Sequence, residues 1–298
     1  MNSYSISNNE VIKMIKYYKY HALGNDYIVI NPAECPLEMT PKIIERICHR
    51  NFGIGSDGIL WGPINQNGRT ALRIFNPDGS EAEKSGNGIR IFSRYLIDKN
   101  LVMTDTFKLD TLGGTVKVEK LDSEGNLIRV AMGKVTFDST KIPVAGADRE
   151  VINEEIDFGG QTYKATCVSI GNPHCVIPMR KISADLAHSL GPIVENHSLF
   201  PNRINMQLLE VIDRNNIKIE IWERGAGYTL ASGSSSSAAA SVAYRLGLVE
   251  RQIAVHMPGG KIDIFIDDDM MVYMTGSVTS VSEGVISKQF YNELINLK

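Results

Sequence analysis

The sequence predicts an α+β fold of two similar lobes, each a mostly antiparallel, barrel-like β-sheet around one central helix. Short apolar runs alternate with turn residues along most of the chain, which is typical of antiparallel strands. Two stretches, 85–96 and 232–246, each read as a helix that starts at a Ser-Gly pair, and they lie about half a chain length apart. A repeat at that spacing predicts two related halves, each aiming a helix start at a shared cleft.

The composition excludes several classes of protein. The chain has 298 residues, 43% hydrophobic and 22% charged, as expected for one large or two ordinary globular domains. A net charge of −3 with no basic run argues against a nucleic-acid binder. No apolar stretch is long enough to span a membrane, and residues 1–16 lack the apolar core of a signal peptide. We therefore expect a cytoplasmic protein with a short N-terminal extension and no membrane partner.

The four cysteines do not form a metal-binding pattern. Cys35, Cys48, Cys167 and Cys175 show neither a Cys-x-x-Cys pair nor zinc-ligand spacing, so no metal site is expected. Reduced thiols that pack as small apolar side chains are the default in such a chain. Because Cys175 follows His174, a reactive thiol there is the alternative.

The first half begins with two predicted strands, 17–21 and 27–31, around a Gly-Asn turn. A helix at 42–50 follows, with Thr40 as its cap and a proline at its first position. The next segment, 53–58, matches the Gly-x-Gly-x-x-Gly pattern, but a helix precedes it and a strand-like run follows it. A dinucleotide site requires the opposite order, so a tight turn is predicted instead.

The remaining elements are strands and one more helix. The two lobes are predicted to be residues 17–134 and 135–277, and the tail, 278–298, is expected to return to the first lobe. Further strands are predicted at 71–75, 107–109, 115–119, 127–131, 162–170, 175–178, 204–211, 217–222, 253–257, 261–266 and 270–275, and a helix at 183–190.

Each of the two Ser-Gly helix starts combines the features of an anion-binding site. Glycine lets backbone amides approach a ligand closely. A helix N-terminus adds unpaired N–H groups and the positive end of the helix dipole, which together suit a carboxylate. Taken alone, each stretch also has the composition of an ordinary loop or linker, and the repeat is what favours a site.

Polar clusters between the strands are candidates for the rest of the site. A buried Asn, Arg or Glu needs a partner, and such residues together suit the carboxylate and amine groups of a zwitterionic ligand. Taken singly, each also suits a turn or an exposed position. The candidates are Asn76, Asn172, Asn205, Glu223 and Arg224.

Six motifs, in order along the chain, make it resemble the diaminopimelate epimerase family. They read HALGNDY (21–27), GIGSDG (53–58), NPDGS (76–80), SGNG (85–88), GNPH (171–174) and ERGAG (223–227), and they belong to a resemblance that covers roughly residues 17–280. The resemblance implies a cofactor-independent epimerase of lysine and peptidoglycan synthesis. It also implies two pseudo-symmetric lobes, a small amino-acid substrate and a homodimer.

The main departure from the family is at the two acid/base positions. In the family, two cysteines face each other across the substrate α-carbon, and each precedes a glycine at a helix start. By motif position they fall at Ser85 and Ser232. A thiol has a pKa of about 8.5, lowered further at a helix start, whereas a serine hydroxyl is a far weaker acid. Acid/base groups work best with a pKa near the operating pH, so the carrier of the proton stays open.

Two further positions depart from the family. Tyr228 stands where the family usually has Glu, and Ser237 stands where many members have a further, non-catalytic Cys. Tyr228 either serves as a phenolic acid/base partner or fills space, and the second interpretation is favoured.

The other site residues carry over by motif position as implications of the resemblance. His174 and Glu223 would tune the acid/base pair, and Asn25 would line the pocket. The distal carboxylate of diaminopimelate would be held by Asn76, Asn172, Asn205 and Arg224, and its distal amine by Glu223. The α-carboxylate, as negative charge builds on it, would be received by the amides of Gly86, Asn87, Gly233 and Ser234.

Three hypotheses about function follow. The chain is an epimerase of the diaminopimelate type with serines at the acid/base positions, a racemase or isomerase for another amino acid, or a ligand-binding homologue without catalysis. The distal clamp favours a diaminopimelate-like ligand over a short amino acid.

Overall fold

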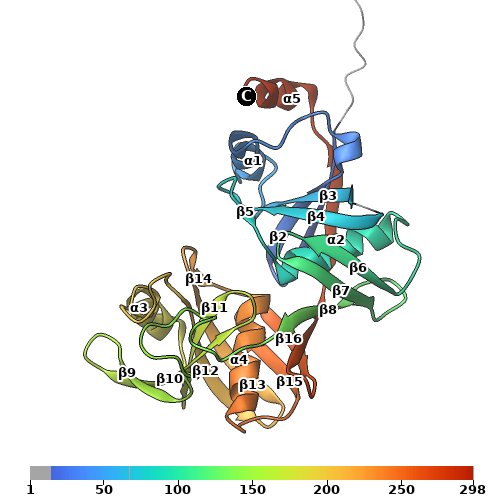
Figure 1. Cartoon of the computed structure of the whole chain (residues 1–298). Helices are drawn as coiled ribbons and strands as arrows, with labels where there is room; N and C mark the ends of the chain where they lie inside the picture. The colour runs from blue at the N-terminus through green and yellow to red at the C-terminus, as the bar shows by residue number, and fades with distance from the viewer. Residues whose placement is uncertain (1–14, 67, 298) are drawn as a thin grey trace, which may run out of the picture.

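Two lobes of strands and helices, joined along one pair of strands, make up the protein (Figure 1). In the computed structural model, which describes residues 15–66 and 68–297, the joining strands are β8 (Leu127–Lys134) and β17 (Met271–Ser277). These two strands pair antiparallel, so the sheet runs continuously from one lobe into the other. The predicted N-terminal extension lies almost entirely outside the described residues.

The N-terminal lobe wraps its strands around one buried helix, α2. Ile89, Ile91, Phe92 and Leu96 of that helix are all buried against the surrounding strands. The elements of the lobe are β1 (Lys16–Ala22), β2 (Asn25–Ile30), the 3-10 turn η1 (Pro32–Glu34), α1 (Pro41–Cys48), β3 (Ile59–Gln66), β4 (Arg69–Phe75), β5 (Glu81–Ala82), α2 (Gly86–Asp98), β6 (Thr106–Thr111), β7 (Gly114–Lys120) and β8.

The C-terminal lobe wraps in the same way around helix α4. This helix carries alanines and serines on its buried faces, and the hydroxyl groups of Ser236, Ser237 and Ser241 each bond to the carbonyl four residues earlier. The elements of the lobe are β9 (Glu154–Asp157), β10 (Thr162–Ser169), β11 (Pro173–Met179), α3 (Ala184–Glu195), β12 (Asn205–Asp213), β13 (Asn216–Glu223), β14 (Gly227–Thr229), α4 (Gly233–Arg245), β15 (Gln252–Met257), β16 (Gly260–Ile266) and β17.

The two lobes repeat the same order of strand pairings. In the first lobe, β1–β2 is antiparallel, β2–β3 parallel, β3–β4 antiparallel, β4–β6 parallel and β6–β7 antiparallel. In the second lobe, β10–β11, β11–β12, β12–β13, β13–β15 and β15–β16 follow the same alternation. The helices take equivalent places, with α1 and α3 inside the first parallel connection and α2 and α4 inside the second. The predicted α+β fold of two similar, mostly antiparallel lobes is therefore confirmed.

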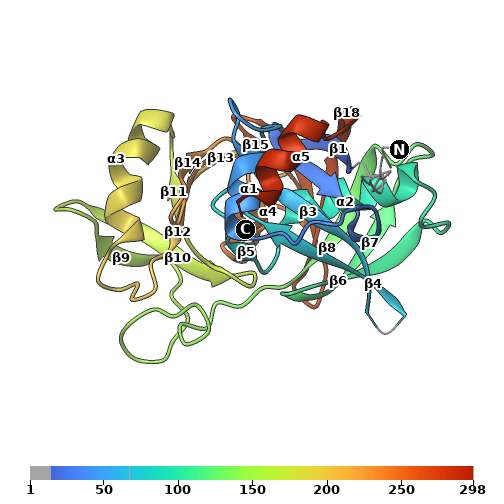
Figure 2. The same cartoon turned by 90° about the horizontal axis from the view of Figure 1, so that it is seen from above.

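The C-terminal tail packs on the N-terminal lobe. Strand β18 (Thr279–Val285) pairs antiparallel with β1, and helix α5 (Lys288–Ile295) lies beside α1 (Figure 2). Arg46 of α1 forms an ion pair of 2.7 Å with Glu293 and lies over the ring of Phe290. The sequence analysis did not predict either element, and the exact lobe boundaries stay a prediction.

Several local expectations are settled by the structure. The segment 53–58 is a turn between α1 and β3, and Gly55 has a φ of +80°, which agrees with the rejection of a dinucleotide site. All four cysteines are free and buried. The neighbouring Cys167, together with burial, raises the pKa of the Cys175 thiol well above its usual value, so the alternative of a reactive thiol is wrong.

Two other kinds of feature are absent from the described part of the chain. None of its helices is long and apolar enough to cross a membrane. Within 15–66 and 68–297, no group of three or more His, Cys, Asp or Glu side chains is arranged to hold a metal ion.

The starts of α2 and α4 meet on one methionine of the joining strand. A Cβ atom on Gly86 would lie 2.6 Å from Cε of Met274, and one on Gly233 would lie 2.7 Å from its Sδ. The same atom on Gly233 would be 3.6 Å from Cα of Gly86, so the two helix starts are in direct contact. A side chain at either place would have to displace the end of the Met274 side chain, which glycine avoids.

We predict that Gly233→Ala destabilises the protein by about 1–3 kcal/mol, because the new methyl group overlaps Met274. Urea unfolding measures the loss. The matched test is the double variant with Met274→Ala, which removes the overlapping side chain. The double variant should then lose less stability than the sum of the losses of the two single variants. A loss equal to that sum would contradict the contact.

Candidate functional site

Two serines cap the two helix starts with the same geometry. Ser85 caps α2 with φ −137° and ψ 117°, and Ser232 caps α4 with φ −147° and ψ 127°. Their Oγ atoms accept hydrogen bonds from the amides of Gly88 (3.0 Å) and Ser235 (3.4 Å). The first amides of each helix, at 86–87 and 233–234, have no acceptor within their own helix and lie where the two helices meet. The sequence-predicted pair of serines is thus brought to one place.

The Ser232 hydroxyl is hydrogen-bonded to a carboxylate. It donates to Oε1 of Glu223 over 2.7 Å, and its Oγ lies 3.4 Å from that of Ser234. Desolvation by the surrounding protein raises the pKa of the Glu223 carboxyl above its usual value, while the bond from Ser232 acts in the opposite direction. Glu223 is therefore a stronger base than an exposed glutamate and is in contact with the hydroxyl that replaces a family thiol.

The Ser85 hydroxyl faces a different partner, the buried phenol of Tyr27. The two oxygens are 3.4 Å apart. Burial raises the pKa of Tyr27 to about 12, and the negative charges of Asp57 and Glu223 add to that effect. The sequence analysis did not single out Tyr27, although it ends the HALGNDY motif that contributes Asn25.

His174 lies at the start of a chain of polar groups that ends at Glu223. Its Nε2 is 3.0 Å from Oδ1 of Asn172, whose amide nitrogen lies 3.4 Å from Oγ of Ser234. Ser234 then reaches Ser232 and Glu223 through the contacts given above. Burial lowers the pKa of His174 to about 3, and the charge of Arg224 contributes, so the ring is neutral at physiological pH.

The amide groups of Asn25 and Asn87 connect the start of α2 to the first motif. Asn87 donates to Oδ1 of Asn25 over 3.0 Å, and Asn25 donates to Asp57 over 2.9 Å. Asp57 also accepts from Arg50, which is paired with Asp26. These bonds fix the loop before β2 and the turn before β3 against the helix start.

A buried arginine of α2 lies behind the first helix start. Arg90 is fully buried, and its guanidinium donates to Oδ1 of Asn87 (3.0 Å), to the carbonyl of Gly86 (3.4 Å) and to the sulfur of Met274 (3.2 Å). Its Nε has no partner among the described residues, and none of its bonds goes to a carboxylate. Burial lowers its pKa to about 10, so it is still a cation at pH 7. The sequence analysis missed this charge, since an arginine on a helix reads as a surface residue.

Three residues that the sequence analysis assigned to substrate also form hydrogen bonds to protein groups. Asn205 donates to the carbonyl of Pro173 and accepts from the amide of Arg224, so it ties together the loops that carry His174 and Glu223. Asn76 donates to Ser80 within its own turn. Arg224 donates to the carbonyl of Asn202 and is otherwise exposed.

The two other departures from the family, Tyr228 and Ser237, form their hydrogen bonds with groups other than the two serines. The Tyr228 hydroxyl donates to Glu220 over 2.5 Å, and its ring stacks on His188. Burial and the contact with Glu220 raise the pKa of Tyr228 to about 12. Ser237 is buried and donates to the carbonyl of Gly233. Tyr228 thus packs in the C-terminal lobe against Glu220 and His188.

Comparison with known sequences assigns this arrangement to a family. A family model described as diaminopimelate epimerase matches residues 17–138 and 166–281. "Diaminopimelate epimerase 2" of Nostoc sp. is 56% identical over 278 residues, which is 93% of this chain and 97% of that protein. "Diaminopimelate epimerase" of Moorella thermoacetica is 38% identical, over 90% of this chain and 98% of that protein. The chain belongs to the diaminopimelate epimerase family.

Solved structures of low sequence identity share the fold. A probable proline racemase from Agrobacterium radiobacter superimposes with a TM-score of 0.68 at 13% identity, covering 92% of this chain and 93% of that one. A phenazine biosynthesis protein of the PhzF family from Bacillus anthracis gives 0.63 at 15% identity, covering 93% and 100%. The two-lobed architecture therefore recurs in proteins of different names.

We predict that His174 makes folding stability depend on acid pH. The unfolded chain binds a proton at this histidine below a pH of about 6.5, whereas the folded protein does so only near pH 3. Its contribution is therefore present above pH 6.5 and is lost as the pH falls toward 3, by up to about 1.4 kcal/mol per pH unit.

Urea unfolding between pH 7.5 and 4.5 measures this slope, with His174→Gln as the variant that removes the titrating group. The variant should lose less stability than the wild type on acidification. Equal slopes, or a ring that titrates near pH 6.5 by NMR, would contradict the assignment.

Proposed function

We propose that this protein epimerises diaminopimelate, interconverting the LL and meso forms by moving the α-proton between the two faces of one carbon. Membership of the diaminopimelate epimerase family supports the substrate and the reaction. The observation that carries the proposal is the contact between two serine-capped helix starts, each with its own hydroxyl and its own unpaired amides. The reaction needs two proton-handling groups on opposite sides of one carbon, and the presence of one serine hydroxyl at each helix start supports this assignment.

In this proposal the α-carboxylate binds to the amides of Gly86, Asn87, Gly233 and Ser234. Removing the α-proton places negative charge on that carboxylate, and preorganised N–H donors at a helix start stabilise such charge. The buried cation of Arg90 lies directly behind the first two amides and has no carboxylate partner. It adds a fixed positive charge where the reaction develops a negative one.

The Ser232 face acts as the base. As Oγ of Ser232 takes the α-proton, its own proton passes along the 2.7 Å hydrogen bond to the Glu223 carboxylate. The C–H bond breaks, an O–H bond forms at Ser232, and the displaced proton ends on Glu223. The raised pKa of Glu223 makes this transfer less unfavourable than it would be for an ordinary carboxylate.

The Ser85 face acts as the acid. Its hydroxyl gives a proton to the opposite face of the α-carbon, and the hydroxyl of Tyr27 replaces that proton. A phenol with a pKa of about 12 is still a far stronger acid than the α-carbon of an amino acid, so this proton transfer is downhill once the carbanion has formed. Removal of the α-proton on the Ser232 face therefore limits the rate. Proton exchange with solvent after product release restores Glu223 and Tyr27, and the reverse reaction uses the same groups with their roles exchanged.

The far end of the substrate is assigned to the rim of the C-terminal lobe. Arg224 is exposed and cationic, which suits the distal carboxylate, and Asn172 is assigned to the same end of the substrate. Asn76 and Asn205 shape the loops around that end through the bonds described above. The homodimer and the cytoplasmic location implied by the family belong to this proposal as well, and sedimentation tests the first.

We predict that the protein exchanges the α-proton of LL- and meso-diaminopimelate with deuterium in heavy water, as followed by NMR. Ser85→Ala and Ser232→Ala should each lower the rate about 10²–10⁴-fold, the usual contribution of a proton-transfer group. The double change to Cys should raise the rate, because a thiol titrates closer to neutral pH.

The matched control is Ser237→Ala on the same helix, where the hydroxyl bonds only to its own helix and the rate should stay within about twofold. Exchange with another amino acid alone would overturn the substrate. The absence of exchange from every form would overturn the activity.

We further predict that the acid limb of the pH–rate profile reports Glu223. The group must be ionised to accept a proton, and its pKa is raised, so activity should fall with decreasing pH at a midpoint above 4.5. Glu223→Gln keeps the shape and removes the base, and should cost at least 10²-fold in kcat/KM together with that limb. A Gln variant that keeps the wild-type profile would show that another group is the base.

A further inference from the structure

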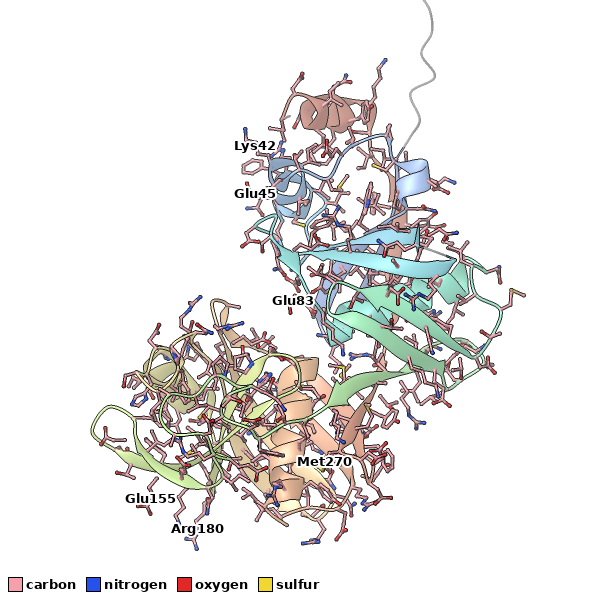
Figure 3. The ribbon with its side chains drawn as sticks, viewed as in Figure 1. Lys42, Glu45, Glu83, Glu155, Arg180 and Met270 are labelled. Atoms are coloured by element: carbon pink, nitrogen blue, oxygen red, sulfur yellow. The ribbon has the colours of Figure 1, made fainter. Side chains whose placement is uncertain are left out.

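A cavity whose lining includes neither Ser85 nor Ser232 lies at the junction between the lobes. It encloses about 580 Å³, within the usual range for small-ligand sites. Only two of its lining residues, Lys84 and Gly171, are chain neighbours of candidate-site residues. Glu83, which precedes Lys84, is labelled in Figure 3 on the edge of the upper lobe that faces the lower one. The lining comes from the segment before α2, from β6, β7, β8 and β17, and from the turn after β10.

Four lysines line this cavity, and no aspartate or glutamate does. They are Lys84, Lys108, Lys117 and Lys134. None of the four forms an ion pair with any carboxylate in residues 15–66 or 68–297. Acidic residues outnumber basic ones in the whole chain, so the cavity is an exception to the overall charge balance.

Two of the lysines are placed directly opposite each other on adjacent strands. Lys108 of β6 pairs in register with Lys117 of β7, and like charges in that position destabilise a sheet. Two residues further along β7, Glu119 faces Arg129 of the strand on the other side, β8, and forms an ion pair of 3.1 Å with it. The sheet therefore pairs its charges next to the cavity, but the positive charges of the two facing lysines inside the cavity have no negative partner.

The third lysine is held at the cavity wall. Lys84 is half-buried, donates to the carbonyl of Met132, and has its pKa lowered by burial. The hydroxyl groups that line the cavity are already used, since Thr115 donates to Asp110 and Tyr273 donates to Asp267. The ammonium groups are thus the donors left for a ligand.

We infer that this cavity binds a compact polyanion of the phosphate type. Lysine is a point charge that suits phosphate oxygens from several directions, whereas a planar carboxylate is held best by the fork of an arginine, and no arginine lines the cavity. Such a ligand would contact Lys84, Lys108 and Lys117 of the N-terminal lobe and lie against Gly171 and Tyr273 on the other side. It would therefore bridge the lobes close to Ser85 without entering the substrate site.

The test is isothermal titration calorimetry with inorganic phosphate, pyrophosphate, ATP and citrate at low salt. The variants are Lys108→Gln/Lys117→Gln and, as the control of equal charge change, Lys164→Gln/Lys181→Gln, two exposed lysines outside the cavity. We expect pyrophosphate or ATP to bind the wild type and the control variant. The affinity for the cavity variant should be at least tenfold lower, and the affinity for the wild type should fall as the salt concentration increases. Tighter binding of ATP than of pyrophosphate would identify an organic phosphate, and equal binding would show that the phosphates alone are recognised.

A second measurement tests whether the cavity variant is folded. Removing two like charges that face each other should leave the circular dichroism of the variant unchanged. It should also raise the Tm of the ligand-free variant, because the repulsion between the two lysines is removed. The inference is overturned if no phosphate anion binds, if both double variants lose affinity equally, or if citrate binds more tightly than every phosphate. None of these readouts depends on epimerase activity.

Discussion

The contact between two helix starts is the constraint on which the rest of the structure depends. Gly86 and Gly233 lie side by side, and both rest on Met274 of the strand that joins the lobes. That contact places two sets of unpaired amides and two serine hydroxyls around one small space. The repeated topology follows from the same requirement, since each lobe must deliver one buried helix, amino end first, to the same point. Burying the cation of Arg90 next to this point fits a ligand that is an anion.

In the proposed reaction, serines at both acid/base positions need neighbouring groups to hold the transferred proton. A thiol titrates near enough to neutral pH to act alone, but a serine needs a neighbour that accepts or supplies its proton. The structure places a different neighbour at each serine, a carboxylate at Ser232 and a phenol at Ser85. This breaks the chemical symmetry that the fold retains. The neutral His174 and its amide neighbours hold the loops in place and supply no charge.

Sequence patterns predicted the fold and the two helix starts because both depend on local chemistry. A serine cap followed by glycine identifies a helix start from four residues, and the repeat shows that it occurs twice. Contacts between distant residues were not accessible in this way: Tyr27 meets Ser85 across 58 positions, and Arg90 is buried only because β17 crosses it. Asn205 was expected to hold substrate, but its amide group is used between two loops. The helix α5 was not predicted because its apolar face is short and can be recognised only from its packing against α1.

The most direct test of the central claim is amide NMR of the labelled protein during titration with LL-diaminopimelate. If one carboxylate is held by both helix starts, the amides of Gly86, Asn87, Gly233 and Ser234 should shift together, with one apparent Kd, and more than the amides elsewhere in either helix. Gly247, at the far end of α4, serves as the internal reference. Shifts confined to one of the two helix starts, or absent from both while the substrate binds, would contradict a shared anion site.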